Sequence, residues 1–78
     1  GFVVLPGGIG TLEESVEIQS WAQLGIHGKG LVYLDVDGYW DPFFALLARM
    51  TEGGFVRPQH AGLALRAHTP EAALDALA

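Results

Sequence analysis

The sequence contains no cysteine, and this absence excludes two kinds of small domain. Neither a disulfide framework nor a thiolate metal site can form without thiols. The absence also fits a reducing compartment, so we expect a cytoplasmic protein. The three histidines, His27, His60 and His68, share neither a helical nor a strand spacing, so we expect surface or loop positions for them and no metal site.

Positive charge is also scarce. Nine acidic residues outnumber four basic ones, which gives a net charge of -5 and a pI near 4.8. Affinity for nucleic acid comes largely from clustered Lys and Arg, and no cluster exists here. The sequence therefore disfavours a nucleic acid polymer as partner. The basic residues are Lys29, Arg49, Arg57 and Arg66.

Long apolar runs are missing as well. No stretch approaches the roughly 20 apolar residues that cross a bilayer, and none resembles a signal peptide, so no membrane partner is expected. Half of the 78 residues are nevertheless hydrophobic, which is much for so thin a core. The chain also opens directly in the apolar run "GFVVLP" without an initiating methionine. We expect residues 1–78 to be the C-terminal part of one larger nucleotide-binding domain.

Strand-like and helix-like segments alternate along the chain. The predicted order is β-α-β-α-β-α, with strands at 2–5, 31–36 and 63–67. The first helix is predicted at 11–24 and the second from 41 to the glycine pair at 53–54. The last helix is predicted from a Thr69 cap to the end of the chain, with Pro70 inside it. This alternation predicts an α/β, Rossmann-like parallel sheet with flanking helices. Ligands of such sheets bind beyond the carboxyl ends of the strands.

The stretch "LPGGIGTLEE" lies at such an end. Its glycines, Gly7, Gly8 and Gly10, stand between a strand and a helix start at Thr11. Free backbone N–H groups and the helix dipole at such a start bind anions, and glycine lets a phosphate approach the backbone. Glycine also tolerates positive φ, which a tight turn can require. A purely steric turn is the alternative, and we favour the phosphate interpretation.

Two common phosphate motifs are excluded by their spacing. The dinucleotide fingerprint requires a third glycine where Glu13 stands, and the P-loop requires Ser or Thr after its lysine, where Gly30 follows Lys29. An ordinary NAD or ATP site is therefore not expected.

Glu14 has two interpretations. With Thr11 it forms the sequence pattern of a capping box, in which the two side chains satisfy N–H donors at the helix start. A carboxylate about one turn into the helix also stands roughly 4–5 Å along the axis from an anion at its end. There it could stabilise the positive charge that develops on a sugar when a glycosidic bond breaks.

The residues from Pro6 to Glu14 match the PGGxGTxxE motif, and the chain thereby resembles the LOG (Lonely Guy) family, cytokinin riboside 5′-monophosphate phosphoribohydrolases. The segments "SWAQLGIHGKG", "VDGYWDPFFALL" and "EGGFV" resemble the family too. The resemblance implies a Rossmann-like fold, a homodimer, and hydrolysis of a purine nucleoside 5′-monophosphate, N6-modified or not, to base and ribose 5-phosphate without a cofactor. An older label for such proteins, lysine decarboxylase, is discounted, because the only lysine lies in a glycine-rich loop.

The same resemblance assigns site residues. Glu14 would be the catalytic carboxylate and Glu13 a secondary substrate-binding candidate, while phosphate and ribose would bind at Gly7, Gly8, Gly10 and Thr11. The helix with Trp21 and Leu24 would contribute to the homodimer. An arginine motif found upstream in the family is absent from these 78 residues, so the segment alone is expected to be inactive.

Two other functions stay open. A related Rossmann-like carrier of nucleotides or of molybdenum cofactor would use the same glycine turn without hydrolysis, and a degenerate fragment would bind no nucleotide. Asp35 and Asp37 follow a strand and could line the same crevice, but Asp37 with Gly38 is a common turn pair, and we favour turn chemistry there. The middle aromatics are expected in core or dimer packing, namely Trp21, Tyr39, Trp40, Phe43 and Phe44.

Overall fold

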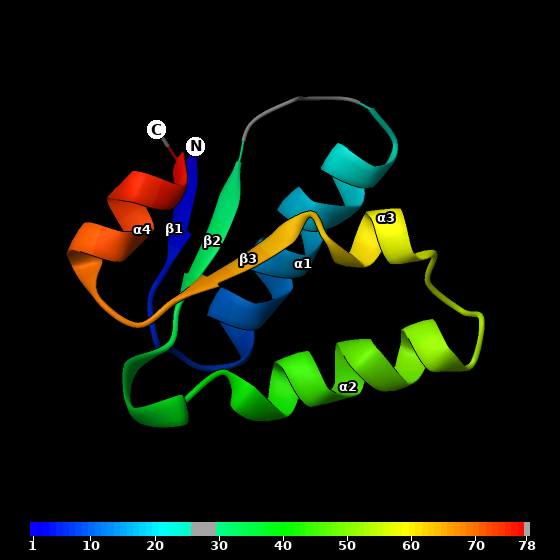
Figure 1. Ribbon diagram of the computed structural model, residues 1–78, viewed down its shortest axis with the longest axis horizontal. Coiled ribbons are helices and arrows are strands. Elements are labelled where there is room, and N and C mark those ends of the chain that lie inside the picture. The colour runs from blue at the N-terminus through cyan, green and yellow to red at the C-terminus, as the bar shows by residue number, and fades with distance from the viewer. Residues whose placement is uncertain (26–29, 78) are drawn as a thin grey trace.

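The chain folds into a three-stranded parallel sheet with helices on both faces, as the sequence predicts (Figure 1). The computed structural model describes residues 1–25 and 30–77. The elements are β1 (Phe2–Val4), α1 (Ile9–Gln23), β2 (Leu31–Leu34), the 3₁₀ turn η1 (Val36–Gly38), α2 (Asp41–Glu52), α3 (Pro58–Ala61), β3 (Ala64–Ala67) and α4 (Pro70–Leu77). The alternating α/β class is therefore confirmed.

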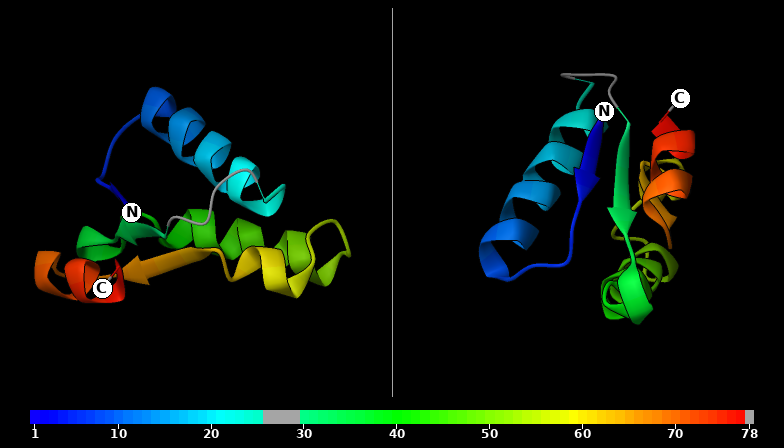
Figure 2. Two further views of the ribbon diagram at one scale, coloured as in Figure 1. Left: turned by 90° about the horizontal axis from the view of Figure 1, so that it is seen from above. Right: turned by 90° about the vertical axis from the view of Figure 1, so that its left-hand side faces the viewer.

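The central strand β2 carries the core. It pairs in parallel with β1 and with β3, and Figure 2 shows α1 on one side of the sheet and α4 on the other. Because side chains alternate along a strand, Leu31 and Tyr33 join the cluster beneath α1 and α2, whereas Val32 and Leu34 join the cluster beneath α4. All four side chains are buried, which is why this strand shows no polar alternation.

Strand β1 is covered on only one face, although its apolar sequence without polar alternation is typical of a strand buried on both faces. Val4 is buried, but Val3 is 41% exposed and the following Leu5 is 57% exposed. The reason is that β1 lies at the edge of the sheet, while α4 packs on β2 and β3.

The start of α1 is also corrected by the structure. The helix begins at Ile9 with Gly8 as its N-cap, and no side chain caps it. Thr11 is therefore the third residue of the helix, and the predicted capping box with Glu14 does not form. The first strand ends at Val4, one residue before the predicted end, and the helix begins two residues before its predicted start.

Other boundaries agree more closely. Thr69 caps α4, since its hydroxyl oxygen accepts the Ala72 N–H at 3.1 Å, and Gly53 ends α2 as predicted. Pro42 is the second residue of α2, within the first turn that proline tolerates. The short helix α3 occupies part of a segment expected to be a loop.

A buried hydrogen bond fixes α1 against the sheet. The Tyr33 hydroxyl donates to Ser15 Oγ at 3.0 Å, and the Ser15 hydroxyl donates to the Leu12 carbonyl at 2.9 Å. Ser15 is 2% exposed and Tyr33 fully buried, and burial is the main reason that the Tyr33 pKa is raised. Because Ser15 follows Glu14 directly, this contact sets which way the Glu14 side of the helix faces.

A charged cluster joins the carboxyl ends of β2 and β3 to the start of α2. Asp35 is fully buried, and its Oδ1 accepts the Trp40 N–H at 2.7 Å. Arg66 Nη1 lies 3.8 Å from Asp35 Oδ2 and donates to Asp41 Oδ1 at 3.0 Å. The arginine also lies over the Phe44 ring, with Cζ 4.6 Å from the centroid.

The two carboxyl groups of this cluster titrate differently. Burial by itself raises the pKa of Asp35, but the neighbouring Asp41 in its protonated form, the hydrogen bond from the Trp40 N–H and the positive charges of His68 and Arg66 outweigh burial and lower it. The pKa of Asp41 is raised, chiefly because its protonated form can hydrogen-bond to Asp35. Of the two carboxyl groups, Asp35 therefore loses its proton at the lower pH.

We predict that the free energy of unfolding of the full-length protein falls as the pH drops through about 4. The folded pKa of Asp35 lies below its unfolded value, so its contribution is present above the unfolded pKa and is lost as the pH falls through the folded one. The opposite shift at Asp41 favours folding at low pH, but this side chain is 59% exposed and solvent screens it.

The check is urea denaturation at several pH values between about 3 and about 7, with Asp35→Asn beside wild type. The variant should lose about 1–3 kcal/mol at neutral pH and show a flatter acid limb. Parallel pH curves for the two proteins would contradict the prediction.

Candidate functional site

The three motif glycines have different structural reasons. A Cβ at Gly7 would lie 2.3 Å from Thr11 Oγ1, so the fold itself excludes a side chain there. A Cβ at Gly8 or Gly10 would meet nothing within 4 Å. None of the three has positive φ, so the expected left-handed turn does not explain them. Gly8 and Gly10 are thus glycines for which the chain shows no steric need.

Backbone donors gather at this turn. The Leu12 N–H donates to the Gly8 carbonyl at 3.1 Å, which is the first bond of α1. The N–H groups of Gly8, Ile9, Gly10 and Thr11 therefore precede the helical bonding pattern and are free at the helix start. With the helix dipole they form a surface suited to an anion, just beyond the carboxyl end of β1.

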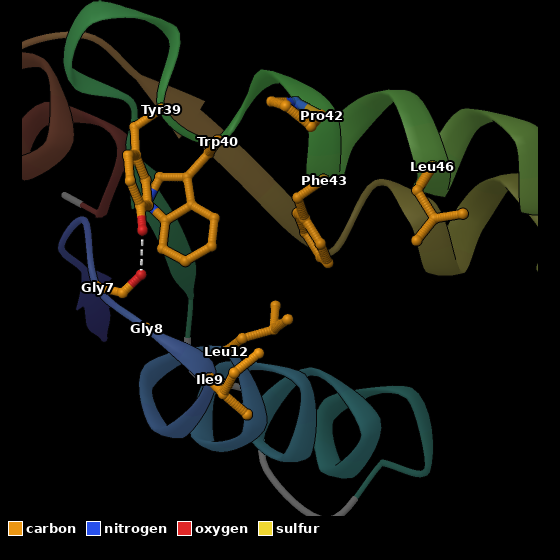
Figure 3. A pocket seen from close by; sticks show the side chains of 9 residues that line it. All are labelled: Gly7, Gly8, Ile9, Leu12, Tyr39, Trp40, Pro42, Phe43 and Leu46. Carbon is orange, nitrogen blue, oxygen red and sulfur yellow. Dashed lines mark hydrogen bonds between the residues drawn. The ribbon is translucent and has the colours of Figure 1, made fainter.

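The predicted site residues are divided between two hollows. Gly7 and Gly8 line a hollow of about 430 Å³ between α1 and the start of α2 (Figure 3). Its walls are otherwise apolar or aromatic, formed by Ile9, Leu12, Tyr39, Trp40, Pro42, Phe43 and Leu46.

Thr11 and Glu14 line the second hollow, of about 210 Å³, between α1 and the open edge of β1. The two residues are three positions apart, so their side chains share one side of the helix. Glu13 lines neither hollow and is exposed, as is Gly10. The structure thus separates Glu13 from Glu14, as their angular difference of about 100° requires.

The earlier helix start changes the reach of Glu14. It lies six positions after Gly8, or roughly 9 Å along the helix axis, whereas the sequence suggested half that distance between Glu14 and an anion. Thr11 lies between them, about one turn from Glu14. An anion at the glycine turn and the Glu14 carboxylate can therefore act on two parts of one ligand that extends past Thr11.

Tyr39 and Trp40 form a wall of the first hollow that sequence reasoning placed only in general packing. The Tyr39 hydroxyl donates to the Gly7 carbonyl, and the dashed line in Figure 3 marks this bond. The buried Trp40 indole N–H has no hydrogen-bond acceptor among the described residues, but it lies on the Tyr39 side. The two rings are perpendicular with centroids 5.2 Å apart, which suits an N–H···π contact. The sequence feature that could have identified these two residues is their position shortly after the end of a strand.

The other polar candidates are not brought to the turn. Asp35 is buried in the charged cluster and lines neither hollow, so the suggestion that it faces the crevice is wrong. Asp37, with φ 53°, and Gly38, with φ 75°, form the expected turn. His27 and Lys29 lie outside the described residues. Within those residues no group of three or more His, Asp or Glu side chains could hold a metal ion, and no helix has the length and hydropathy to span a membrane.

Comparisons with known proteins agree with the motif. Residues 1–77 match a family model described as "Possible lysine decarboxylase". The chain is 45% identical over 76 residues to a probable cytokinin riboside 5′-monophosphate phosphoribohydrolase of Oryza sativa subsp. japonica, covering 97% of this chain and 31% of that protein. It is 49% identical over 57 residues to a cytokinin riboside 5′-monophosphate phosphoribohydrolase of Arabidopsis thaliana, covering 73% of this chain and 26% of that protein.

A second rice protein, again named as a probable cytokinin riboside 5′-monophosphate phosphoribohydrolase, is 54% identical over 59 residues, which are 76% of this chain and 26% of that protein. The chain thus spans about a third or less of the length of these curated relatives. The family model matches nearly all of the sequence, and the PGGxGTxxE motif forms a strand-to-helix turn with open backbone donors. The chain therefore belongs to the family that this model describes, which includes the LOG phosphoribohydrolases.

Proposed function

We propose that the full-length protein hydrolyses the N-glycosidic bond of a purine nucleoside 5′-monophosphate, giving free base and ribose 5-phosphate. The main observation in support is that Gly8 and Gly10 leave open space where α1 begins with free backbone N–H groups. A glycine inside a helix costs about 0.5–1 kcal/mol relative to alanine, so close approach of a ligand is the better reason for Gly10. The names of the relatives support the reaction and a cytokinin nucleotide as substrate.

The proposed chemistry follows from the order of groups along α1. The phosphate accepts hydrogen bonds from N–H groups at the glycine turn, and its ribose extends past Thr11 toward Glu14. As the bond between C1′ and the base nitrogen breaks, positive charge develops on the sugar, and the Glu14 carboxylate stabilises it and orients hydroxyl groups. Water adds to C1′, one of its protons passes to the leaving base, and hydrolysis is balanced without a redox partner.

We further propose that these residues are the C-terminal part of one larger Rossmann-like domain. The apolar edge strand β1, with Val3 and Leu5 exposed, supports this, since parallel sheets usually cover such strands. The hollow with Glu14 opens along the same edge, so a further part of the domain would complete the site. The arginine expected from the family would come from there, and residues 1–78 alone would be inactive.

The subunit arrangement we propose is a homodimer through the outer side of α1. Trp21 is 45% exposed and Leu24 is 70% exposed, on a helix whose apolar residues are spread around its axis. Such a helix buries one side on its own sheet and offers another to a partner. The cytoplasmic location expected from the sequence stays a prediction.

Phosphate binding at the glycine turn can be tested by substitution. Gly10→Ala should leave the melting temperature unchanged or slightly raised, because alanine favours the helix and its Cβ meets nothing, yet should weaken AMP binding about tenfold or more. Gly62→Ala is the matched control, since its Cβ would make only ordinary contacts at 3.7 Å and it lies in another loop. Calorimetric titration that finds equal AMP affinity in both variants would reject the phosphate interpretation and leave a steric turn.

The second prediction separates the adjacent carboxylates. Glu14→Gln should lower kcat for base release by about 10²-fold or more while AMP binding changes little, because only the charge is removed. Glu13→Gln should stay within about twofold of wild type, since Glu13 faces away from the hollow. Release from AMP and from N6-isopentenyl-AMP gives the substrate preference. Tight binding without release by wild type would favour the nucleotide or molybdenum-cofactor carrier instead.

The third prediction tests the subunit contact. Trp21→Glu should shift the protein from dimer to monomer in sedimentation velocity at micromolar concentration, because a charge cannot be buried unpaired. Leu74→Glu on α4, at a side chain 66% exposed on the opposite side of the sheet, is the control and should stay dimeric. Loss of the dimer in the control alone would place the contact on α4.

A further inference from the structure

We propose that Asp35 is a positioning residue for the glycine turn, although it lies in a different loop and touches no part of the proposed nucleotide site. Its effect would pass through the Trp40 N–H and the Tyr39 hydroxyl to the Gly7 carbonyl. The inference rests on the proposed function in one respect only, namely that the turn binds the phosphate.

The first step is the anchoring of the loop after β2. Asp35 is fixed on both sides of its backbone, because its N–H donates to the Ala67 carbonyl at 2.7 Å and its carbonyl lies 3.1 Å from His68 Nδ1. Its buried carboxylate then holds the Trp40 N–H at 2.7 Å. A hydrogen bond to a charged acceptor is stronger than one between neutral groups, so this bond holds the loop from Asp35 to Trp40 closed.

The loop needs such an anchor. Asp37 and Gly38 both have left-handed backbone angles, and only the glycine adopts them without cost. The loop leads directly into Tyr39, which is half exposed, and Trp40, whose ring packs edge-on against Tyr33 with centroids 5.3 Å apart. The position of Tyr39 is therefore set by the bonds on either side of it, to Asp35 through Trp40 and to Gly7.

The last step is the orientation of one peptide group. The Tyr39 hydroxyl donates to the Gly7 carbonyl, and Figure 3 shows it reaching across from the α2 side of the hollow. In a trans peptide the C=O and the following N–H point in opposite directions. Holding the Gly7 carbonyl toward Tyr39 therefore directs the Gly8 N–H away from it, out of the aromatic hollow.

Without this bond the peptide is poorly restrained. It joins two glycines, whose backbone angles are the least restricted of any residue. A phosphate would then have to fix the peptide on binding and pay the entropy of ordering it. Tyr39 and Asp35 would thus pre-organise a donor of the anion site, with Asp41, Arg66 and His68 keeping the Asp35 carboxylate charged.

The experiment is a double-mutant cycle in the full-length protein with ribose 5-phosphate as the probe. Tyr39→Phe keeps the ring and removes only the hydroxyl, and Asp35→Asn keeps an acceptor oxygen but removes the charge. Each single variant should weaken ribose 5-phosphate binding about three- to tenfold. The double variant should bind about as weakly as Tyr39→Phe alone, because both changes act through the same bond.

The matched control is Val32→Ala, a core truncation beneath α4 that lowers stability without touching the loop. On its own it should leave the affinity for ribose 5-phosphate unchanged, and in combination with Tyr39→Phe it should add nothing to the loss that Tyr39→Phe causes. A merely structural role for Asp35 predicts independent effects in the double variant and a similar loss in Val32→Ala. Tyr39→Phe alters a half-exposed side chain, so it reports on the last step even if Asp35→Asn fails to fold.

The outcomes separate this inference from the proposed function, which is measured in parallel as AMP cleavage. Cleavage by wild type, with unchanged ribose 5-phosphate binding in Tyr39→Phe, overturns the inference alone. No cleavage, with the expected non-additive loss of binding, supports the inference and removes the hydrolase. A wild-type protein that binds no ribose 5-phosphate overturns both.

Discussion

The structure depends on burying β2 on both faces. Its four apolar residues lie between the clusters beneath α1 and α2 on one side and beneath α4 on the other. Full burial of such a side chain stabilises the fold by about 1.5–3 kcal/mol, and two-sided burial requires helices on both faces of the parallel sheet. The carboxyl ends of the three strands consequently meet at one edge, where the loops with chemical groups gather.

Polar contacts then determine where each loop stands. The bond from Tyr33 to Ser15 fixes the rotation of α1, and the Asp35 carboxylate fixes the start of α2. Both contacts are buried, so each unmade bond would cost the desolvation of its polar group. They bring segments that are far apart in sequence to a common edge, and the hydroxyl of Tyr39 joins these segments directly at Gly7.

The resulting site is modular. One side of the glycine turn is aromatic and closed by α2, whereas the other side, with Thr11 and Glu14, opens along the edge of β1. The helix start between the two, with its free N–H groups, suits the proposed phosphate, and the carboxylate farther along the helix suits the proposed action on the sugar. Membership of the LOG-containing family supports the proposed reaction.

The sequence by itself determined the order of strands and helices and the glycine turn, because hydrophobic runs, glycines and caps act within a few residues. It also made Glu14 the candidate catalytic residue, through a motif whose spacing needs no tertiary contact. Only the tertiary structure decided that α1 starts at Ile9, that Glu14 lines the hollow beside β1, and that Asp35 is buried. These outcomes depend on contacts such as that of Ser15 with Tyr33, between residues too far apart in sequence for local pattern to specify.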